Sequence, residues 1–271
     1  MTGSGLDGVV EAVGGVDPAA FAALTGAGVV GVVAALPYQL DGLDDGTDPS
    51  IPLVVLNAVV VNGLLVALAV LVGLVLGADA GFAVVEGGAL AVEPLALGAV
   101  TGAAGGAVLV ALDRCLFAPR LTDTGLDSSV DGGPSPLFGL LASLYGGVTE
   151  ELLTRFGLVS LLAWIGWRLG GGASGGPGPV VVWAAVPLAA ALFGLAHLPA
   201  TARKATLTPP VVARALALNG LPGVLFGWLF WRSGLVVAMV SHFAADLVVH
   251  VAFPTLRAAR GGTPASSGSD D

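Results

Sequence analysis

The chain has 271 residues, of which 55% are hydrophobic and only 11% are charged. A soluble domain has roughly a quarter of its residues charged, so this composition excludes an ordinary water-soluble protein. The net charge of −9 disfavours binding to nucleic acid. The single cysteine, Cys115, excludes an intrachain disulfide and a metal cage made of cysteines.

Apolar segments recur along the chain at lengths close to the ~20 residues that a helix needs to cross a bilayer. We expect seven spans, at residues 19–40, 52–77, 90–112, 137–167, 180–197, 211–231 and 235–253. The fourth is long enough to be one tilted helix or a short helix preceded by an interfacial piece, so eight spans remain an alternative. The predicted fold class is an all-α, polytopic transmembrane helical bundle in the cell membrane.

The connections and boundaries complete this outline. Residues 41–48 form an acidic loop, residues 113–136 are predicted to be a solvated loop, and Pro199 is expected to end the fifth segment. Gly98, Gly102 and Gly106 predict close packing on another helix. The first apolar stretch lacks a preceding basic region, so no cleaved signal peptide is expected. We divide the chain into N-terminal transmembrane helices with acidic loops (1–136), a catalytic helical core (137–254) and a disordered polar tail (255–271).

Basic residues indicate the orientation of the bundle. With seven spans, the loops after the third and fifth segments and the C-terminus lie on the same side. That side carries Arg114, Arg120, Arg203, Lys204, Arg257 and Arg260. The positive-inside rule places it in the cytoplasm and the N-terminus outside.

Polar residues interrupt three of the apolar segments. They read Glu150-Glu151-x-x-x-Arg155, Phe193-x-x-x-His197 and His242-x-x-x-Asp246. Charged side chains at membrane depth cost several kcal/mol and are usually paired and functional. Helical spacing lets Glu151 reach Arg155, whereas Glu150 points about 100° away from its neighbour. We therefore expect one glutamate to face a cavity and the other to hold the arginine, and we expect the motifs to converge in the cytoplasmic half of the bilayer.

Two chemistries suit a carboxylate and two imidazoles around a cavity. In one, Glu150 takes a proton from water and the histidines assist. In the other, Glu150, His197 and His242 hold a divalent metal such as zinc, which activates the water. The chain contains no His-Glu-x-x-His sequence, which is typical of a zinc protease helix. Both chemistries predict hydrolysis, while a proton- or ion-coupled transporter and a non-catalytic immunity or scaffold protein remain alternatives.

These motifs, in this order, resemble those of the CPBP family of intramembrane proteases, which includes the type 2 CAAX prenyl endopeptidases and the Abi proteins. The resemblance covers about residues 137–253, including the glycine-rich run 219–227. It implies an endopeptidase in the bilayer that cleaves a membrane-associated or lipidated protein. In that family's pattern Glu150 and His197 activate water, His242 and residue 246 stabilise the oxyanion, and the family has been described both as glutamate-dependent and as metal-dependent.

The chain departs from the family pattern at three positions. Many members have Phe and Gly on either side of the motif arginine, where this chain has Thr154 and Phe156. An oxyanion-binding member has Asn where this chain has Asp246. An ionised carboxylate cannot donate a hydrogen bond, so we expect Asp246 to be protonated, to orient His242 or to ligate a metal.

Overall fold

The computed structural model of the chain describes residues 5–40, 50–121, 135–172 and 175–261. The acidic loop 41–48 and most of the expected tail and of the 113–136 loop lie outside these ranges. The first half of the chain forms α1 (Gly5–Gly14), α2 (Pro18–Leu40), α3 (Ile51–Val72), η1 (Gly73–Gly77), η2 (Glu86–Gly88), α4 (Val92–Leu112), η3 (Asp113–Phe117) and η4 (Ala118–Arg120). The second half forms α5 (Pro136–Leu144), η5 (Tyr145–Glu150), η6 (Leu152–Val159), α6 (Ser160–Leu169), α7 (Pro179–Ala196), α8 (Leu198–Ala202), α9 (Pro209–Ser233), α10 (Leu235–Leu247), η7 (Val248–Ala252) and α11 (Phe253–Gly261).

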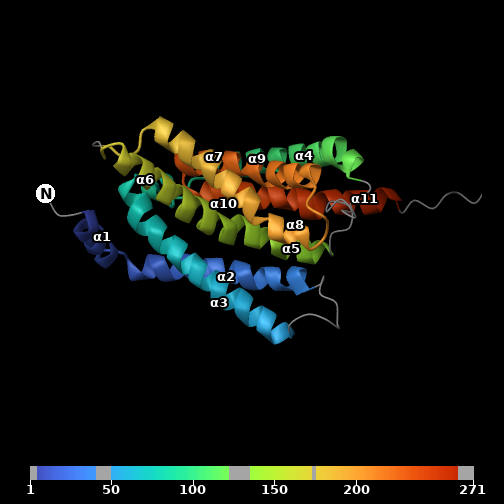
Figure 1. Ribbon diagram of the computed structural model, residues 1–271, viewed down its shortest axis with the longest axis horizontal. Helices are drawn as coiled ribbons and strands as arrows, with labels where there is room; N and C mark the ends of the chain where they lie inside the picture. The colour runs from blue at the N-terminus through green and yellow to red at the C-terminus, as the bar shows by residue number, and fades with distance from the viewer. Residues whose placement is uncertain (1–4, 41–49, 122–134, 173–174, 262–271) are drawn as a thin grey trace, which may run out of the picture.

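Within the described residues, seven helical spans are long and apolar enough to cross a membrane. They run roughly along the long axis of the molecule (Figure 1). The fourth is a single helical span, Pro136–Leu169, so the described residues contain seven spans and not the alternative eight. The predicted all-α polytopic bundle is confirmed.

The prediction of a solvated loop beginning at residue 113 is wrong for its first eight residues. The helix of α4 continues through η3 and η4 to Arg120. Asp113 is only 1% exposed and accepts two hydrogen bonds from Arg214 on α9, at 2.6 Å from Nε and 2.8 Å from Nη2. Phe117 packs against Leu121 and Val211. A buried ion pair and an apolar contact therefore hold this segment against α9.

Two helix ends also differ from expectation. The helix resumes after His197 as α8, with Pro199 in its first turn, where the missing N–H of proline is not needed. Pro199 therefore marks a bend and not the end of the helical segment. Residues 253–261 form α11, so the first part of the expected tail is helical.

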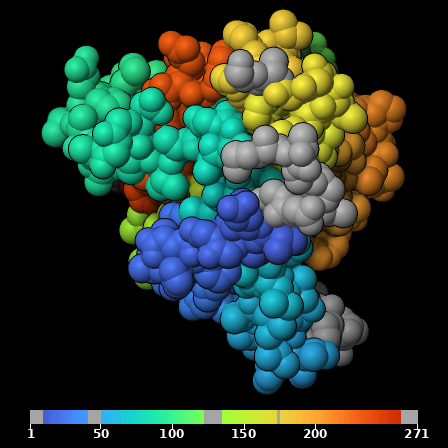
Figure 2. All heavy atoms as spheres, turned by 90° about the vertical axis from the view of Figure 1, so that its left-hand side faces the viewer, coloured from blue at the N-terminus to red at the C-terminus, as the bar shows by residue number. Residues whose placement is uncertain are grey.

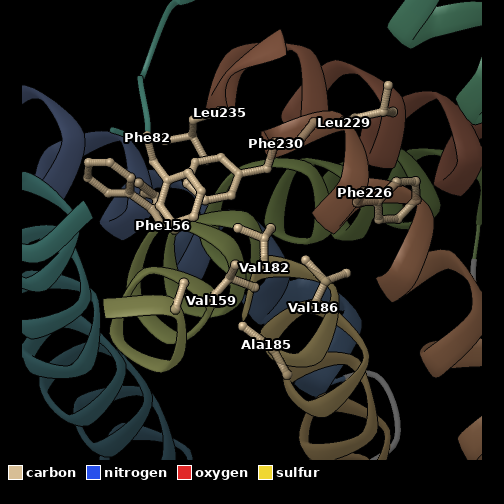
Figure 3. Packing of buried hydrophobic residues seen from close by; sticks show 14 of the residues in the cluster. Phe82, Phe156, Val159, Val182, Ala185, Val186, Phe226, Leu229, Phe230 and Leu235 are labelled. Carbon is tan, nitrogen blue, oxygen red and sulfur yellow. The ribbon is translucent and has the colours of Figure 1, made fainter. Parts of the chain in front are cut away.

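The main hydrophobic core draws on both halves of the chain. One buried cluster, part of which is shown in Figure 3, surrounds Phe156 of η6. It also contains Val66 and Val70 of α3, Phe82, and Phe230 of α9. The rings of Phe82 and Phe230 lie 5.0 Å apart. Residues on either side of position 136 therefore share one core.

The predicted glycine stripe on α4 packs on α10. A methyl group added at Gly98 would lie 2.8 Å from the carbonyl oxygen of Val237, and one added at Gly106 would lie 2.5 Å from that of Ala245. At Gly102 it would clash with the backbone of Ser241. Close approach of the two backbones thus requires glycine at these positions.

The outer half of α3 projects from the bundle, as the end-on view in Figure 2 shows. Its exposed side chains are large and apolar: Ile51, Leu53, Leu56, Val60, Val61 and Leu64. Exposed apolar side chains are expected on a helix that contacts lipid, since lipid hydrocarbon is as apolar as leucine.

Candidate active site

The Glu-Glu-Arg motif lies in a helix that is wider than the expected α-helix. Residues Tyr145–Glu150 and Leu152–Val159 are π-helical, and Glu151 joins the two stretches. Thr149 anchors this segment to α2 by donating a hydrogen bond of 2.8 Å to the carbonyl of Gly28. Gly31 of α2 leaves room for the Thr149 hydroxyl, against which any side chain would clash. Short π-helical stretches often occur at functional sites.

Glu151 and Arg155 form the buried support of the site. Glu151 is fully buried and Arg155 is 2% exposed, and Arg155 Nη1 lies 2.8 Å from Glu151 Oε1. The same oxygen lies 2.7 Å from Nδ1 of His242 on α10. Glu151 therefore holds both the arginine and the histidine, and the sequence predicted only the first of these contacts.

Arg155 also lies between two aromatic rings that touch the two histidines. Its guanidinium lies 5.4 Å from the ring centre of Phe193 and 5.3 Å from that of Phe226. Phe226 stacks on His242 with ring centres 4.6 Å apart, and Phe193 meets His197 edge-on at 4.5 Å. Cation–π and aromatic contacts thus run from one histidine to the other through the arginine.

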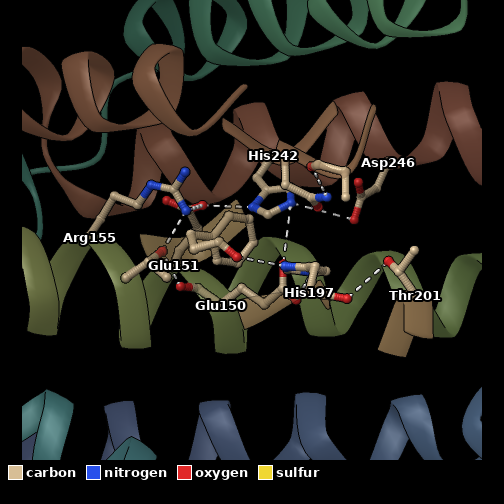
Figure 4. A network of polar contacts seen from close by, with 11 residues as sticks. Glu150, Glu151, Arg155, His197, Thr201, His242 and Asp246 are labelled. Carbon is tan, nitrogen blue, oxygen red and sulfur yellow. Dashed lines mark hydrogen bonds and ion pairs between the residues drawn. The ribbon is translucent and has the colours of Figure 1, made fainter. Parts of the chain in front are cut away.

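Glu150 faces the opposite way, toward the two imidazoles (Figure 4). Its Oε1 lies 3.7 Å from His197 Nε2, and its Oε2 lies 3.8 Å from His242 Nε2. Oδ2 of Asp246 lies 3.7 Å from the same His242 nitrogen. Each of these distances is longer than the length of a direct hydrogen bond, but a single water can bind to both side chains of a pair. The side chains of Glu150, His197 and Asp246 are 16%, 33% and 20% exposed, so the cluster is accessible from outside the core.

The partners of Nδ1 determine the proton positions on both rings. His197 Nδ1 lies 2.9 Å from the carbonyl oxygen of Phe193, which can only accept, so Nδ1 carries a proton. His242 Nδ1 likewise donates to the carboxylate of Glu151, which is paired with Arg155. In each histidine the other ring nitrogen, Nε2, faces Glu150. Nε2 is therefore the atom that can bind a water or the substrate.

The same side chains were candidates for holding a metal. Within the described parts of the chain, no group of three His, Cys, Asp or Glu side chains is arranged to hold a metal ion. The 3.7 and 3.8 Å separations of Glu150 from the two histidines suit a shared water.

Two further residues of the site were missed from the sequence. Phe226 was included in the glycine-rich run 219–227, but nothing in that run indicated that its ring stacks on His242. Gly146 lies against the site from η5, where an added methyl group would clash with Asp246 Oδ2 and lie 3.2 Å from His242 Nε2. The glycine pair before the motif was the available signal for such a close approach.

Comparison with protein families identifies this part of the chain. Residues 132–248 match the family model described as Type II CAAX prenyl endopeptidase Rce1-like. This segment is similar to the CAAX protease family. The match supports a CAAX-protease-like intramembrane endopeptidase at the level of the family, and it favours neither the transporter nor the immunity or scaffold alternative. No curated protein and no solved structure matches the chain.

All the motif residues noted in the sequence lie within the matched segment. The matched segment contains α5, η5, η6 and α6–α10, while α2, α3 and α4 lie outside it. The seven apolar spans and the family together identify a multi-pass membrane protein.

Proposed function

We propose that the protein is an endopeptidase of the cell membrane that hydrolyses a peptide bond in a membrane-associated protein, using a water activated by Glu150. The observation that carries the proposal is the placement of the Glu150 carboxylate, with one oxygen 3.7 Å from His197 Nε2 and the other 3.8 Å from His242 Nε2. A base must lie within reach of the proton that it removes, directly or through one water.

The reaction begins with a water between Glu150 and His197. Glu150 Oε1 accepts one of its protons while the lone pair on His197 Nε2 accepts a hydrogen bond from the other. The oxygen attacks the peptide carbonyl carbon, whose oxygen becomes negatively charged. Glu150 then gives its proton to the leaving nitrogen as the C–N bond breaks, which regenerates the carboxylate.

His242 stabilises the oxyanion from its Nε2. Donation from Nε2 requires both ring nitrogens to carry protons, because Nδ1–H is already given to Glu151. The carboxylates of Glu150 and Glu151 lie on either side of the ring's nitrogens and stabilise that positive charge. Glu151, Arg155 and Phe226 support His242 without contacting the reacting atoms.

Asp246 contributes to the oxyanion in its protonated form. Glu151 and Phe226 already orient His242, so Asp246 is not required to position the ring. A protonated carboxyl group can donate a hydrogen bond as an asparagine amide does at this position of the family pattern. This role distinguishes Asp246 from Glu151, whose carboxylate is a buried acceptor.

The substrate class follows from the position of the site. The cluster lies within the helical spans, with Glu150 near the middle of Pro136–Leu169 and His197 at the junction of α7 and α8. A peptide that reaches it is held at the membrane, by a lipid group or by a span of its own. A prenylated Cys-aliphatic-aliphatic-X peptide is the first substrate to test, because the matched family is described by it.

Glu150→Gln tests the mechanism directly. The amide keeps the size of the side chain but cannot take a proton, so we expect cleavage to fall about a hundred-fold or more. The measurement is the rate of cleavage of the prenylated peptide by the full chain in liposomes, together with new peptide termini in membranes of cells that express each variant.

The matched control is Glu93→Gln, the same substitution in the exposed first turn of α4. It should leave cleavage unchanged, and thermal unfolding should be alike in both variants. A Glu150→Gln variant that cleaves the peptide at the wild-type rate would contradict the mechanism. Loss of wild-type activity with a chelator, restored by zinc, would replace the metal-free reaction with a metal-dependent one.

A further inference from the structure

The outer half of α3 projects from the bundle (Figure 2), while its inner half is packed in the core. Val66 and Val70 of the inner half are fully buried, whereas Leu53, Val60 and Leu64 of the outer half are exposed. The described part of the chain therefore leaves one apolar face of this helix uncovered.

A polar side chain, that of Asn57, lies on the same face. Asn57 is exposed, and within the described residues its amide makes no hydrogen bond. Asn62 of the same helix differs, because its amide donates a hydrogen bond of 2.8 Å to the carbonyl oxygen of Ala58. The donors and the acceptor of the Asn57 amide are thus all available to a partner outside the chain.

The depth of Asn57 makes an unbonded amide costly. The span Ile51–Gly77 has 27 residues. At 1.5 Å per residue it is about 40 Å long, so it extends roughly 5 Å beyond each edge of the ~30 Å hydrocarbon layer. Asn57 lies about 9 Å from the start of the span, which is inside the hydrocarbon. Because lipid chains offer no hydrogen bonds, a polar group at this depth requires a protein partner.

The spacing of residues on this face is that of two paired helices. Leu53, Asn57, Val60 and Leu64 follow one another at intervals of four, three and four residues. This is the a/d pattern of helix pairs, in which a single asparagine fixes the register. A carboxamide both donates and accepts hydrogen bonds, so its best match is another carboxamide at the same level.

These requirements are met by a second copy of the chain. Two copies in one membrane are inserted with the same orientation, so a two-fold axis between them runs along the membrane normal, and residues of the same number meet at that axis. We propose that the chain forms a homodimer through the outer half of α3, in which the two Asn57 side chains bond to each other and Leu53, Val60 and Leu64 pack around them. The interface lies outside the segment 132–248, and the proposal does not depend on the proposed protease function.

Energy transfer between copies of the full chain in phosphatidylcholine liposomes tests the dimer. Donor and acceptor dyes are attached to separate preparations at Cys115, the single cysteine of the chain, which is exposed. We expect transfer well above that of randomly distributed monomers. Asn57→Leu should weaken the dimer about tenfold, because the hydrogen bond between the helices is lost. Asn57→Gln keeps a carboxamide and should keep most of the dimer.

The matched control is Asn62→Leu. It removes the other asparagine of α3, whose amide is bonded within its own helix, and it should leave the dimer unchanged. Disulfide cross-linking in cell membranes then locates the interface in a chain that carries Cys115→Ser. Val60→Cys should join two copies on mild oxidation, whereas Val100→Cys, at an exposed position of α4, should not.

Four results would overturn the proposal. Transfer no greater than that of random monomers at every ratio of protein to lipid would show that lipid alone covers α3. The other three are an Asn57→Leu dimer as stable as the wild type, an equal loss in Asn62→Leu, and equal cross-linking of Val60→Cys and Val100→Cys.

Discussion

Individual residues in the site divide into those that face the cavity and those that hold them there. Glu150 and Glu151 are neighbours in the chain, yet one is 16% exposed and the other is fully buried. The buried carboxylate binds Arg155 and His242, and removing one partner of a buried ion pair leaves an uncompensated charge. The two carboxylates therefore have different tasks because of their surroundings and not because of their chemistry.

Phe226→Leu isolates the stacking contact on His242. The variant keeps an apolar side chain but loses the flat ring, so we expect the imidazole to reorient and kcat to fall about tenfold with KM unchanged, a barrier change of about 1.4 kcal/mol. Loss of buried carbon should also cost roughly 1–2 kcal/mol of the free energy of unfolding. The measurements are cleavage kinetics and thermal unfolding.

The same helix offers a matched control, Phe230→Leu. Phe230 is as buried as Phe226, but it packs against Phe82 and away from the histidines. Its replacement should lower stability by a similar amount and leave kcat unchanged. An equal fall of kcat in both variants would show that Phe226 acts through general packing alone.

Pairs of helices set the distances within the site. His242 and Asp246 are carried by α10, which lies between the glycines of α4 on one side and Gly146 and Gly147 of η5 on the other. Glycine at these contacts lets the helix axes approach, which places His242 against Glu151. The stripe on α4 lies outside the catalytic motifs, but it fixes the position of the helix that bears one of them.

Gly102→Ala tests this helix contact. The added methyl group would clash with the backbone of Ser241, so we expect α4 and α10 to separate slightly and the free energy of unfolding to fall by about 1–3 kcal/mol. Thermal unfolding and cleavage should fall together. Gly105→Ala is the control, because its methyl group would lie 3.4 Å from Leu225 Cδ2, an ordinary contact. Equal effects of the two substitutions would contradict the close-packing account.

The whole molecule is one packed unit, although the family match covers only residues 132–248. Phe156 of the matched segment packs with Val66 and Val70 of α3, and Thr149 is bonded to α2. The proposed division into an N-terminal part and a catalytic core therefore separates the chain by motif content, while the hydrophobic core crosses it.

A fragment of residues 135–261 should not fold alone in detergent. It would expose the apolar surfaces that α2, α3 and α4 cover, and it would lose the Asp113–Arg214 ion pair, leaving a buried arginine unpaired by that carboxylate. We expect no cooperative thermal transition and no cleavage. Co-expression with residues 1–134 should restore both. A fragment that unfolds cooperatively and cleaves peptide by itself would show that the core is independent.

The sequence alone determined the features that depend on local pattern. Apolar length predicted seven spans, and spacing of four residues predicted the Glu151–Arg155 pair and the shared face of His242 and Asp246, since such contacts lie within one helix. The glycine stripe on α4 was likewise visible as a periodic pattern.

Only the tertiary structure decided the contacts between helices. The bond from Glu151 to His242 joins residues 91 positions apart, and the stack of Phe226 on His242 and the Asp113–Arg214 pair also cross between helices. Such contacts depend on how the axes cross and on the wider π-helical turn around the motif, and neither leaves a period in the sequence. The same packing decides which charged side chains are buried. The sequence predicted that Asp113 lies in a solvated loop, but the structure pairs it with Arg214. Packing also brings His242 to Glu151 as a second partner beside Arg155.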